Sequence, residues 1–305
     1  MILRASGIPD DRGLRQPGRV GAMELGGAES DFAGPAEGGR VGAAILGFRT
    51  GEGQGLDLRV AAAPAVTVVI GFGDAGFVVD DAVGRQSSTG LVAGPALAAA
   101  RVRCERAECI EIRLSPLRAY SLLAVSPRDL GRGMSGWEEL WGGPARRLRA
   151  GLAAATDWDE RFALTKSFLT RIDRCREPDP EVVACWNDIL AARGQVRVAD
   201  LAQSCGWSRK RLWSRFESQI GLTPKRAAML VRFRCAVDGL LAGRSAAEVA
   251  AEGGYADQAH LHRDVSIFAG STPGVLATRY LPDIARYRHR AWGTFSQYST
   301  GPLGR

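Results

Sequence analysis

Residues 196–224, VRVADLAQSCGWSRKRLWSRFESQIGLTP, decide the fold of the C-terminal part of the chain. One buried helical face is predicted by apolar residues spaced three or four apart, namely Val198, Leu201, Ala202 and Cys205. Gly206 ends that helix, and Ser208 is a good N-cap for a second helix, which Gly221 terminates. A helix, a glycine turn and a second helix together make the helix-turn-helix plan.

A second copy of this pattern follows at residues 245–273, SAAEVAAEGGYADQAHLHRDVSIFAGSTP. The turn glycine recurs 48 residues on, at Gly254, and the Thr-Pro pair that opens the next helix recurs 49 residues on, at Thr272-Pro273. Between the copies we expect a long helix over Lys225–Leu241. One such pattern has many false positives, but two in register are a far more specific signal.

The basic excess of the chain lies in the same segment. The 305 residues carry 40 Lys+Arg and 33 Asp+Glu, a net charge of +7. Residues 194–290 hold 15 of the basic and 8 of the acidic residues, so the rest of the chain is neutral overall. A basic excess confined to one small helical domain is typical of nucleic-acid binding.

Residues 182–282 resemble the AraC/XylS family of bacterial transcription regulators. The resemblance is carried by Ala199-Asp200-Leu201-Ala202, Gly206-Trp207-Ser208, Leu212, Phe216, Gly221-Leu222-Thr223-Pro224, Arg232, Ala236, Ala250, Gly254-Tyr255-Ala256-Asp257-Gln258, Leu261, Arg263 and Gly270-Ser271-Thr272-Pro273. Residues 112–172 also look like the helical part that follows the small β-domain in an actinobacterial-type branch of the family. The resemblance implies an α+β protein: a cupin-like β-barrel with a helical extension, then an all-α domain of two helix-turn-helix units joined by a long helix.

The resemblance also implies two recognition helices, at about 208–220 and 257–269, in successive major-groove faces on one side of the DNA. The positions implied to face bases are Arg209, Lys210, Trp213, Ser214, Gln258, Ala259, His260, His262 and Arg263. Arg and Lys can pair with guanine, and Gln with adenine. The residues better placed for phosphates, which position a protein without specifying sequence, are Arg211, Arg215, Lys225 and Arg226.

Some positions depart from the family pattern. Ser214 stands where the family usually has Arg, and Arg215 stands where it has an apolar residue. We therefore expect the first helix to read DNA differently, or Arg215 to substitute by a side-chain swing. In the second helix Leu261 and Val265 replace the usual aromatic pair, which keeps the core apolar but makes it smaller.

Three of the implied contact residues also have structural interpretations. Trp213 is as readily a core residue as a base or sugar contact. His260 and His262 lie two apart on the predicted helix and point in different directions, which disfavours a shared metal ion.

Residues 1–259 contain no histidine at all, which excludes His-bearing zinc sites, the two-His-one-carboxylate triad and Ser-His-Asp chemistry there. No metal, cofactor or catalytic residue is predicted, and the protein is not expected to be an enzyme.

The glycine-rich first half predicts short antiparallel strands. Residues 1–150 hold 25 of the 38 glycines, and β-prone runs lie between them at 43–48, 65–72, 76–79, 91–93, 101–104 and 109–114. Short strands separated by turn signals favour a sandwich or a barrel. Residues 110–114 alternate apolar with charged side chains, as a half-buried strand does.

Helices are predicted after Ser115, which is a good N-cap. Four helices are expected. The first covers 117–124, and the second is short and begins with a capping box of Ser135 and Glu138. The third covers 144–155, and the fourth begins at Asp157. The last segment carries an apolar stripe, for which a core face is a simpler explanation than a dimer seam: Trp158, Phe162, Thr165, Leu169 and Ile172.

The interior of the predicted barrel has two interpretations. It could hold an apolar ligand, or it could simply be filled by its own lining, which is the default for a small barrel. The predicted lining is Val66, Val68, Ile70, Phe72, Phe77, Ile110 and Ile112. Cys104 and Cys109 could form a redox switch, but the acidic neighbours Glu105 and Glu108 offset the basic ones that would lower a thiol pKa.

The predicted organisation is a disordered tail (1–28), a sensor or dimerisation domain (29–175; barrel-like 40–115, helices 116–174), a linker (176–181), a DNA-binding domain (182–290) and a flexible tail (291–305). Double-stranded DNA is the predicted partner; RNA polymerase, a small-molecule effector and a second copy of the chain stay open. The sequence has no long apolar stretch, so a cytoplasmic protein without a membrane contact is expected.

Two alternative functions remain open from the sequence. One is a DNA alkylation-repair methyl acceptor, which would want clustered cysteines near the N-terminus, whereas no cysteine precedes Cys104. The other is a non-specific nucleic-acid binder.

Overall fold

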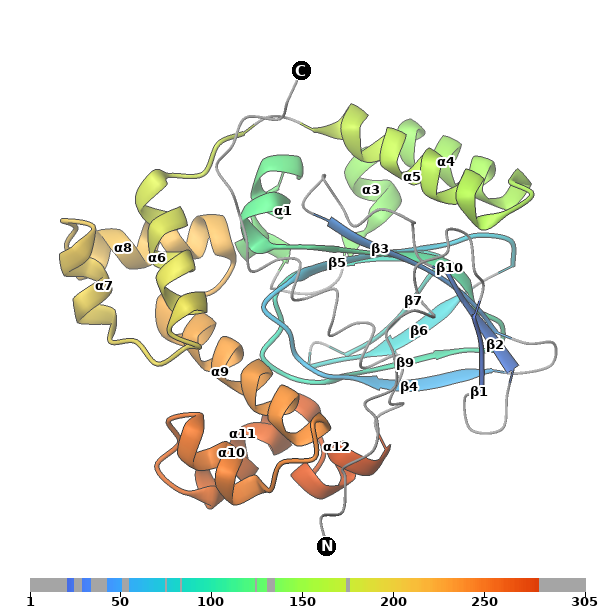
Figure 1. Ribbon diagram of the computed structural model, residues 1–305. Coiled ribbons are helices and arrows are strands. Elements are labelled where there is room, and N and C mark those ends of the chain that lie inside the picture. Colours follow the sequence, from blue (N-terminus) through green and yellow to red (C-terminus); the bar gives the residue numbers. More distant parts are fainter. Residues whose placement is uncertain are drawn as a thin grey trace, which may run out of the picture.

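The computed structural model describes residues 21–24, 29–33, 43–50, 55–74, 76–82, 84–123, 125–130, 135–173 and 176–279. A β-sandwich with helices on one side is followed by an all-α part that lies beside it (Figure 1). The predicted tail over 291–305 falls outside the described residues, as do residues 1–20. Within the predicted tail over 1–28, residues 21–24 form a strand, so the tail prediction does not hold there.

Two antiparallel sheets build the N-terminal part. The larger, in the order β1-β2-β3-β10-β5-β8-β11, comprises β1 (Gly21–Glu24), β2 (Glu29–Ala33), β3 (Ala43–Thr50), β5 (Val66–Gly71), β8 (Gly90–Ala93), β10 (Glu108–Leu114) and β11 (Ser135–Gly136). The smaller, in the order β4-β9-β6-β7, comprises β4 (Leu56–Val60), β6 (Phe77–Asp80), β7 (Arg85–Ser88) and β9 (Ala100–Cys104).

The two sheets form an open sandwich, not the predicted closed barrel. Among the described strands no pairing joins one sheet to the other, and β9 leads into β10 by crossing from the smaller sheet to the larger. All six predicted strands are present. The sequence analysis missed β1, β2, β4, β7 and β11. The sequence of β7 is RQSS, which has no apolar residue that could signal a strand.

The central strands of the larger sheet are buried on both faces. The outward-facing Ile110 and Ile112 pack under the helices, while the charged side chains between them, Glu111 and Arg113, are only 6% and 8% exposed. The prediction of a half-buried strand at 110–114 is therefore wrong. Its charged face points into the sandwich and not into water.

Helices cover the outer face of the larger sheet (Figure 1). They are α1 (Pro116–Leu122), α2 (Pro127–Leu130), α3 (Trp137–Trp141), α4 (Gly143–Ala154) and α5 (Trp158–Ile172). Ser115 caps α1 and Asp157 caps α5, as predicted. The predicted capping box at Ser135 does not form, because Ser135 pairs with Val92 in the sheet and α3 begins at Trp137. The apolar stripe of α5 is a core face, since all of its five members are buried.

The C-terminal part is all-α. Its helices are α6 (Pro180–Ala191), α7 (Val198–Ser204), α8 (Arg209–Ile220), α9 (Pro224–Leu241), α10 (Ala246–Glu252), α11 (Gln258–Ala269) and α12 (Pro273–Arg279). Ala62 and Leu117 of the N-terminal part belong to the same hydrophobic core as these helices. One core thus crosses the predicted domain boundary. Over the described residues, no helix has the length and apolar character needed to cross a membrane.

Candidate nucleic-acid interface and inner cavity

The first helix-turn-helix unit consists of α7 and α8. Gly206 turns the chain between them with a φ of +67°, in the left-handed region that glycine enters at low cost. The Ser208 hydroxyl then accepts a hydrogen bond from the backbone N–H of Arg211 at 3.2 Å, which caps α8. Leu212 and Phe216 are fully buried against the C-terminal core. The opposite face of α8 is thereby directed to solvent.

The second unit, α10 and α11, repeats this construction. The turn glycine is Gly254, with a φ of +68°, and Asp257 caps α11 by accepting from the backbone N–H of His260 at 2.7 Å. Helix α10 begins with a full capping box of Ser245 and Glu248. The sequence analysis missed that box, although the Ser-x-x-Glu spacing is visible in the sequence.

Helix α9 connects the two units and orients the second (Figure 1). Its 18 residues span about 27 Å at about 1.5 Å per residue. Arg232 of α9 pairs with Asp264 of α11 at 3.2 Å and lies over the Tyr255 ring, 4.5 Å from its centroid. Burial raises the pKa of the Tyr255 hydroxyl, which keeps this group neutral. The result is a fixed seat for α11.

The residues implied to face bases lie on the solvent-directed faces of α8 and α11. Eight of them are exposed, namely Arg209, Lys210, Trp213, Ser214, Gln258, Ala259, His262 and Arg263. Trp213 is 43% exposed, which rules out the core interpretation. His260 is half-buried, with its ring edge-on to Tyr255 at 5.2 Å, so it is the member of the set that the structure directs inward.

The residues proposed for phosphates differ in their surroundings. Lys225 and Arg226 are exposed at the start of α9, and Arg211 lies over the Trp207 ring at 4.5 Å. Arg215 instead makes two hydrogen bonds of 2.6 Å to the Asp179 carboxylate, just before α6. The Arg215 guanidinium lowers the pKa of Asp179, so the pair stays charged.

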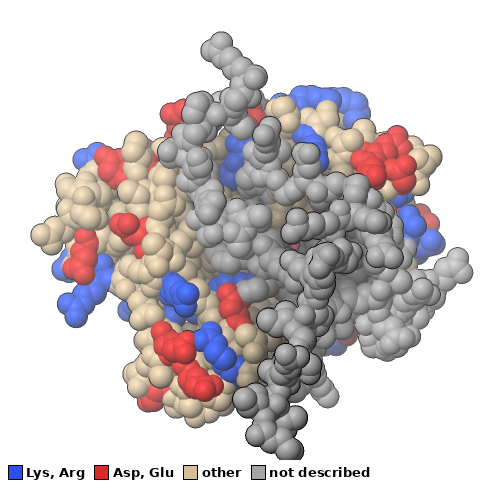
Figure 2. Space-filling view, viewed as in Figure 1, with Lys and Arg blue, Asp and Glu red and all other residues tan. Residues whose placement is uncertain are grey.

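Figure 2 shows one face of the molecule, on which blue Lys and Arg side chains at the left-hand edge, over the α7–α8 part, stand beside red acidic ones. The basic residues on this face are therefore interspersed with acidic residues.

The N-terminal part holds both recognition helices at their C-terminal ends. At α8, the Ser126 hydroxyl donates to the Ser218 carbonyl, and Pro127 packs directly against Gly221. At α11, the backbone N–H of Ala62 donates to the Phe268 carbonyl at 2.7 Å. These contacts join residues far apart in the sequence, and no local pattern announces them.

A second contact at α11 comes from Arg59 of β4, whose guanidinium donates to the carbonyl of Gly270. Both docking sites leave the N-terminal halves of α8 and α11 exposed. The exposed halves carry the residues implied to face bases.

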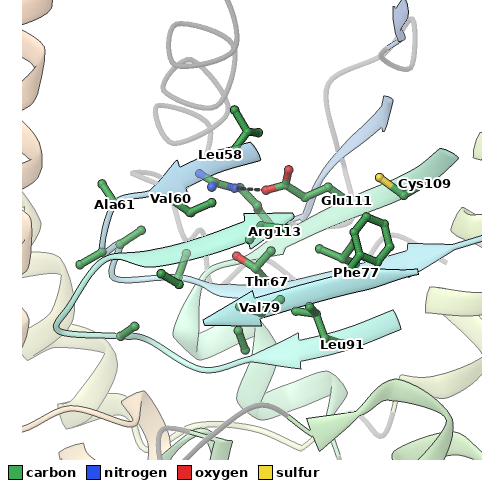
Figure 3. Close-up of a pocket in the computed structure, with 18 of the residues that line it drawn as sticks. Leu58, Val60, Ala61, Thr67, Phe77, Val79, Leu91, Cys109, Glu111 and Arg113 are labelled. Atoms are coloured by element: carbon green, nitrogen blue, oxygen red, sulfur yellow. Dashed lines mark hydrogen bonds and ion pairs between the residues drawn. The ribbon is translucent and has the colours of Figure 1, made fainter. Parts of the chain in front are cut away.

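A cavity of about 150 Å³ lies between the two sheets (Figure 3). Most of its lining is aliphatic or aromatic, with contributions from Phe48, Val69, Phe77, Val79, Leu91 and Val102. Arg113 and Glu111 are its two charged lining residues among those described, and they form an ion pair of 2.7 Å inside it. The sandwich is thus hollow, and its mostly apolar lining includes a buried ion pair and the polar Thr67.

The predicted lining was mostly on the wrong face of the sheet. Phe77 lines the cavity, whereas Val66, Val68, Ile70, Phe72, Ile110 and Ile112 pack against the helices on the outer side. Cys109 also lines the cavity, and Cys104 is buried beside it in the same cluster. Burial raises the pKa of Cys104, which disfavours the reactive thiolate.

Two helix-turn-helix units in register, each with a capped and exposed recognition helix, define a double helix-turn-helix DNA-binding domain. Residues 201–279 match the family model described as helix-turn-helix domain, which is of the AraC type. Residues 201–279 therefore form a helix-turn-helix domain of the AraC type.

Three solved structures are similar to this chain at low sequence identity. ToxT from Vibrio cholerae is 10% identical over 77% of this chain and 98% of its own, with a TM-score of 0.46. A ToxT structure with a bound unsaturated fatty acid is 10% identical over 77% of this chain and 94% of its own, with a TM-score of 0.43. The C-terminal domain of AraT, a response regulator from Geobacillus stearothermophilus, is 17% identical over 34% of this chain and 89% of its own, with a TM-score of 0.33. A comparison with curated protein sequences gives no match.

Proposed function

We propose that this protein is a sequence-specific DNA-binding transcription regulator that reads two elements of one operator, one with α8 and one with α11. The observation that carries the proposal is the pair of exposed, capped recognition helices joined by α9. The α9 length of about 27 Å is comparable with the roughly 34 Å between major-groove faces one turn apart. Two units so joined can reach successive faces of one duplex.

The exposed side chains supply the chemistry for reading bases. Arg209 and Lys210 at the start of α8, and Arg263 in α11, can pair with guanine O6 and N7, while Gln258 can pair with adenine. Trp213, Ser214 and His262 complete the proposed base-contacting set, and His260 contributes only if its ring leaves Tyr255. The proposed phosphate contacts are Lys225, Arg226 and Arg211. Arg215 can contact a phosphate only after its hydrogen bonds to Asp179 break.

Selection from a random duplex pool with the full-length protein, near ~0.15 M salt where electrostatic binding alone is weak, tests this proposal. The expected result is a two-part motif whose elements lie about 10 base pairs apart. A motif with one element, or with another spacing, would contradict the two-helix reading. Equal affinity for selected and random duplexes at the same salt would favour the non-specific alternative instead.

Two variants then separate the proposed roles. Arg263→Ala should change which bases are preferred and weaken operator binding by about 1–3 kcal/mol. Lys225→Ala should weaken binding to all sequences alike and flatten the salt dependence. Equal losses on every sequence for both variants would show that the division of roles is wrong.

The surroundings of three cysteines speak against the methyl-acceptor alternative. Burial raises the pKa of Cys104 and Cys235, and it raises the pKa of Cys185 to about 12. Thiols held in the protonated form are poor nucleophiles. Treatment with a methylating agent, followed by mass spectrometry, is expected to find no preferentially methylated cysteine.

We further propose that a small molecule bound in the N-terminal part controls DNA binding. The cavity between the sheets supports this role, since ligand sites are typically mostly apolar hollows with a few polar groups. RNA polymerase and a second copy of the chain remain additional proposed partners, for which the described residues single out no surface.

A further inference from the structure

The inner cavity has room for a small apolar molecule. A volume of about 150 Å³, lined by aliphatic and aromatic side chains, accommodates a molecule about as large as benzene. Leu91 and Phe77 face each other across this space from the two sheets (Figure 3). An apolar ring of that size would contact both sheets at once.

The ion pair in the cavity wall limits the charge of the ligand. Glu111 and Arg113 have side chains only 7% and 10% exposed, and they lie on the same face of β10. A carboxylate ligand would be attracted by Arg113 but repelled by Glu111. An ammonium ligand would be attracted by Glu111 but repelled by Arg113. A buried charge without net compensation is costly, whereas a hydroxyl can donate to the carboxylate or accept from the guanidinium.

The cavity wall is also the seat of the second recognition helix. Val60, Ala61, Ala62 and Ala63 line the cavity, and the same segment binds the end of α11 through the Ala62–Phe268 hydrogen bond. Arg59, directly before Val60, donates to the Gly270 carbonyl. One short piece of chain therefore has the ligand space on one side and α11 on the other, whereas α8 is held elsewhere, by Ser126 and Pro127.

We propose that the cavity binds a neutral, single-ring-sized apolar compound bearing one hydroxyl group, and that its binding acts on DNA recognition through residues 59–63 and α11. The ligand class follows from the cavity itself, while the action on α11 rests on the proposed DNA-binding function. Binding then alters affinity for the operator element read by α11 and leaves the element read by α8 unchanged.

Calorimetry on the full-length protein without DNA tests the ligand class. The probes are benzyl alcohol, benzoate and benzylamine, which share one ring and differ in charge. Benzyl alcohol should bind at least about tenfold more tightly than either ion, because each ion brings an unbalanced charge into a buried site. Absence of binding by all three, or tighter binding of benzoate, would overturn the proposed ligand class.

Variants show whether these probes occupy the cavity. Ala93→Leu places a larger side chain into the lining and should weaken benzyl alcohol binding at least about tenfold, while the same change at exposed Ala154 should have no effect. Glu111→Gln removes the negative charge and should shift the preference toward benzoate by about tenfold or more. Thermal unfolding of each variant checks that it is folded. Unchanged binding by folded Ala93→Leu would place the probes elsewhere.

The action on α11 is measured on duplexes in which one or the other operator element is scrambled. Saturating benzyl alcohol should change affinity about fivefold or more where the α11 element is intact, within the usual range of coupling between sites. Arg59→Ala should reduce this effect without changing the calorimetric affinity. The control is Arg101→Ala, which replaces the cross-strand partner of Arg59, an exposed arginine bound to Asp57 and not to α11.

The outcomes separate the two proposals. Failure to bind any operator, both with and without benzyl alcohol, would refute the proposed DNA-binding function and leave the calorimetric result standing. Operator binding that the bound alcohol leaves unchanged, or changes equally for both elements, would refute the route through residues 59–63 and leave the DNA-binding function intact.

Discussion

Replacing Gly221 by alanine tests whether the N-terminal part really holds the first recognition helix. Gly221 ends α8 with a φ of +84°, and a methyl group on it would lie 2.8 Å from the carbonyl oxygen of Pro127. Gly206 is the matched control, because its φ is +67° but no atom lies within 4 Å of the position its methyl group would take. Both variants pay for the left-handed backbone; only Gly221→Ala also collides with another part of the protein.

The magnitudes follow from these two geometries. A left-handed alanine costs roughly 1–2 kcal/mol, of which about 0.4–1 kcal/mol is offset because alanine restricts the unfolded chain. Gly206→Ala should therefore lower the free energy of unfolding by about 1 kcal/mol. Forcing an extra carbon against backbone adds about 1–3 kcal/mol, so Gly221→Ala should lose about 2–4 kcal/mol. The loss is expected to be larger because the Pro127 carbonyl cannot turn aside as a flexible side chain can.

Urea unfolding followed by circular dichroism measures the two losses, and hydrogen exchange locates them. Faster exchange in α2 and at the end of α8 is expected for Gly221→Ala alone. Equal losses in both variants, with the same exchange pattern, would refute the contact between Pro127 and Gly221 as a source of stability.

Three further results are expected. Trp213→Ala should reduce operator affinity but change the free energy of unfolding by no more than about 0.5 kcal/mol, as a side chain on the exposed face of α8 should; comparing binding with urea unfolding checks this. Because the pKa of Asp179 is lowered, its ion pair with Arg215 stabilises the fold above about pH 4, and this stabilisation is lost as the pH falls further. Arg215 is half exposed, so Asp179→Asn should lower the free energy of unfolding by under about 1 kcal/mol at pH 7. In strong acid the same variant should have no effect. Burial raises the pKa of Asp238 to about 6, so stability should fall as the pH rises from about 4 to about 6, and Asp238→Asn should flatten that part of the unfolding profile.

The helical C-terminal domain was predictable because its signals are local. Ser208, Asp257 and the turn glycines act within a few residues of themselves, and the spacing of Leu212 and Phe216 identifies the buried face directly. Pairing preferences between distant segments do not enter. The recognition helices therefore begin and end within a residue of the predicted bounds.

The β part shows where this logic stops. Alternation along residues 110–114 distinguishes two faces of a strand but does not tell which of them meets a second sheet. Glu111 and Arg113 lie inside because their ion pair offsets much of the cost of burial, and the helices cover Ile110 and Ile112 on the other side. The same limit applies to Arg215, whose partner Asp179 lies 36 residues away.

The three attachments of the reading helices have a consequence for operator architecture. Helix α9 links the two units. Contacts from Ser126 and Pro127 hold the first unit, and contacts from Arg59 and Ala62 hold the second. The distance and the angle between the two recognition helices are therefore fixed. A changed base in the operator costs two helices held in this way one contact. An inserted base pair between the elements rotates one element away from its recognition helix by about a tenth of a turn. Binding sites for such a protein should vary in base sequence from one site to another, while the number of base pairs between the two elements stays constant.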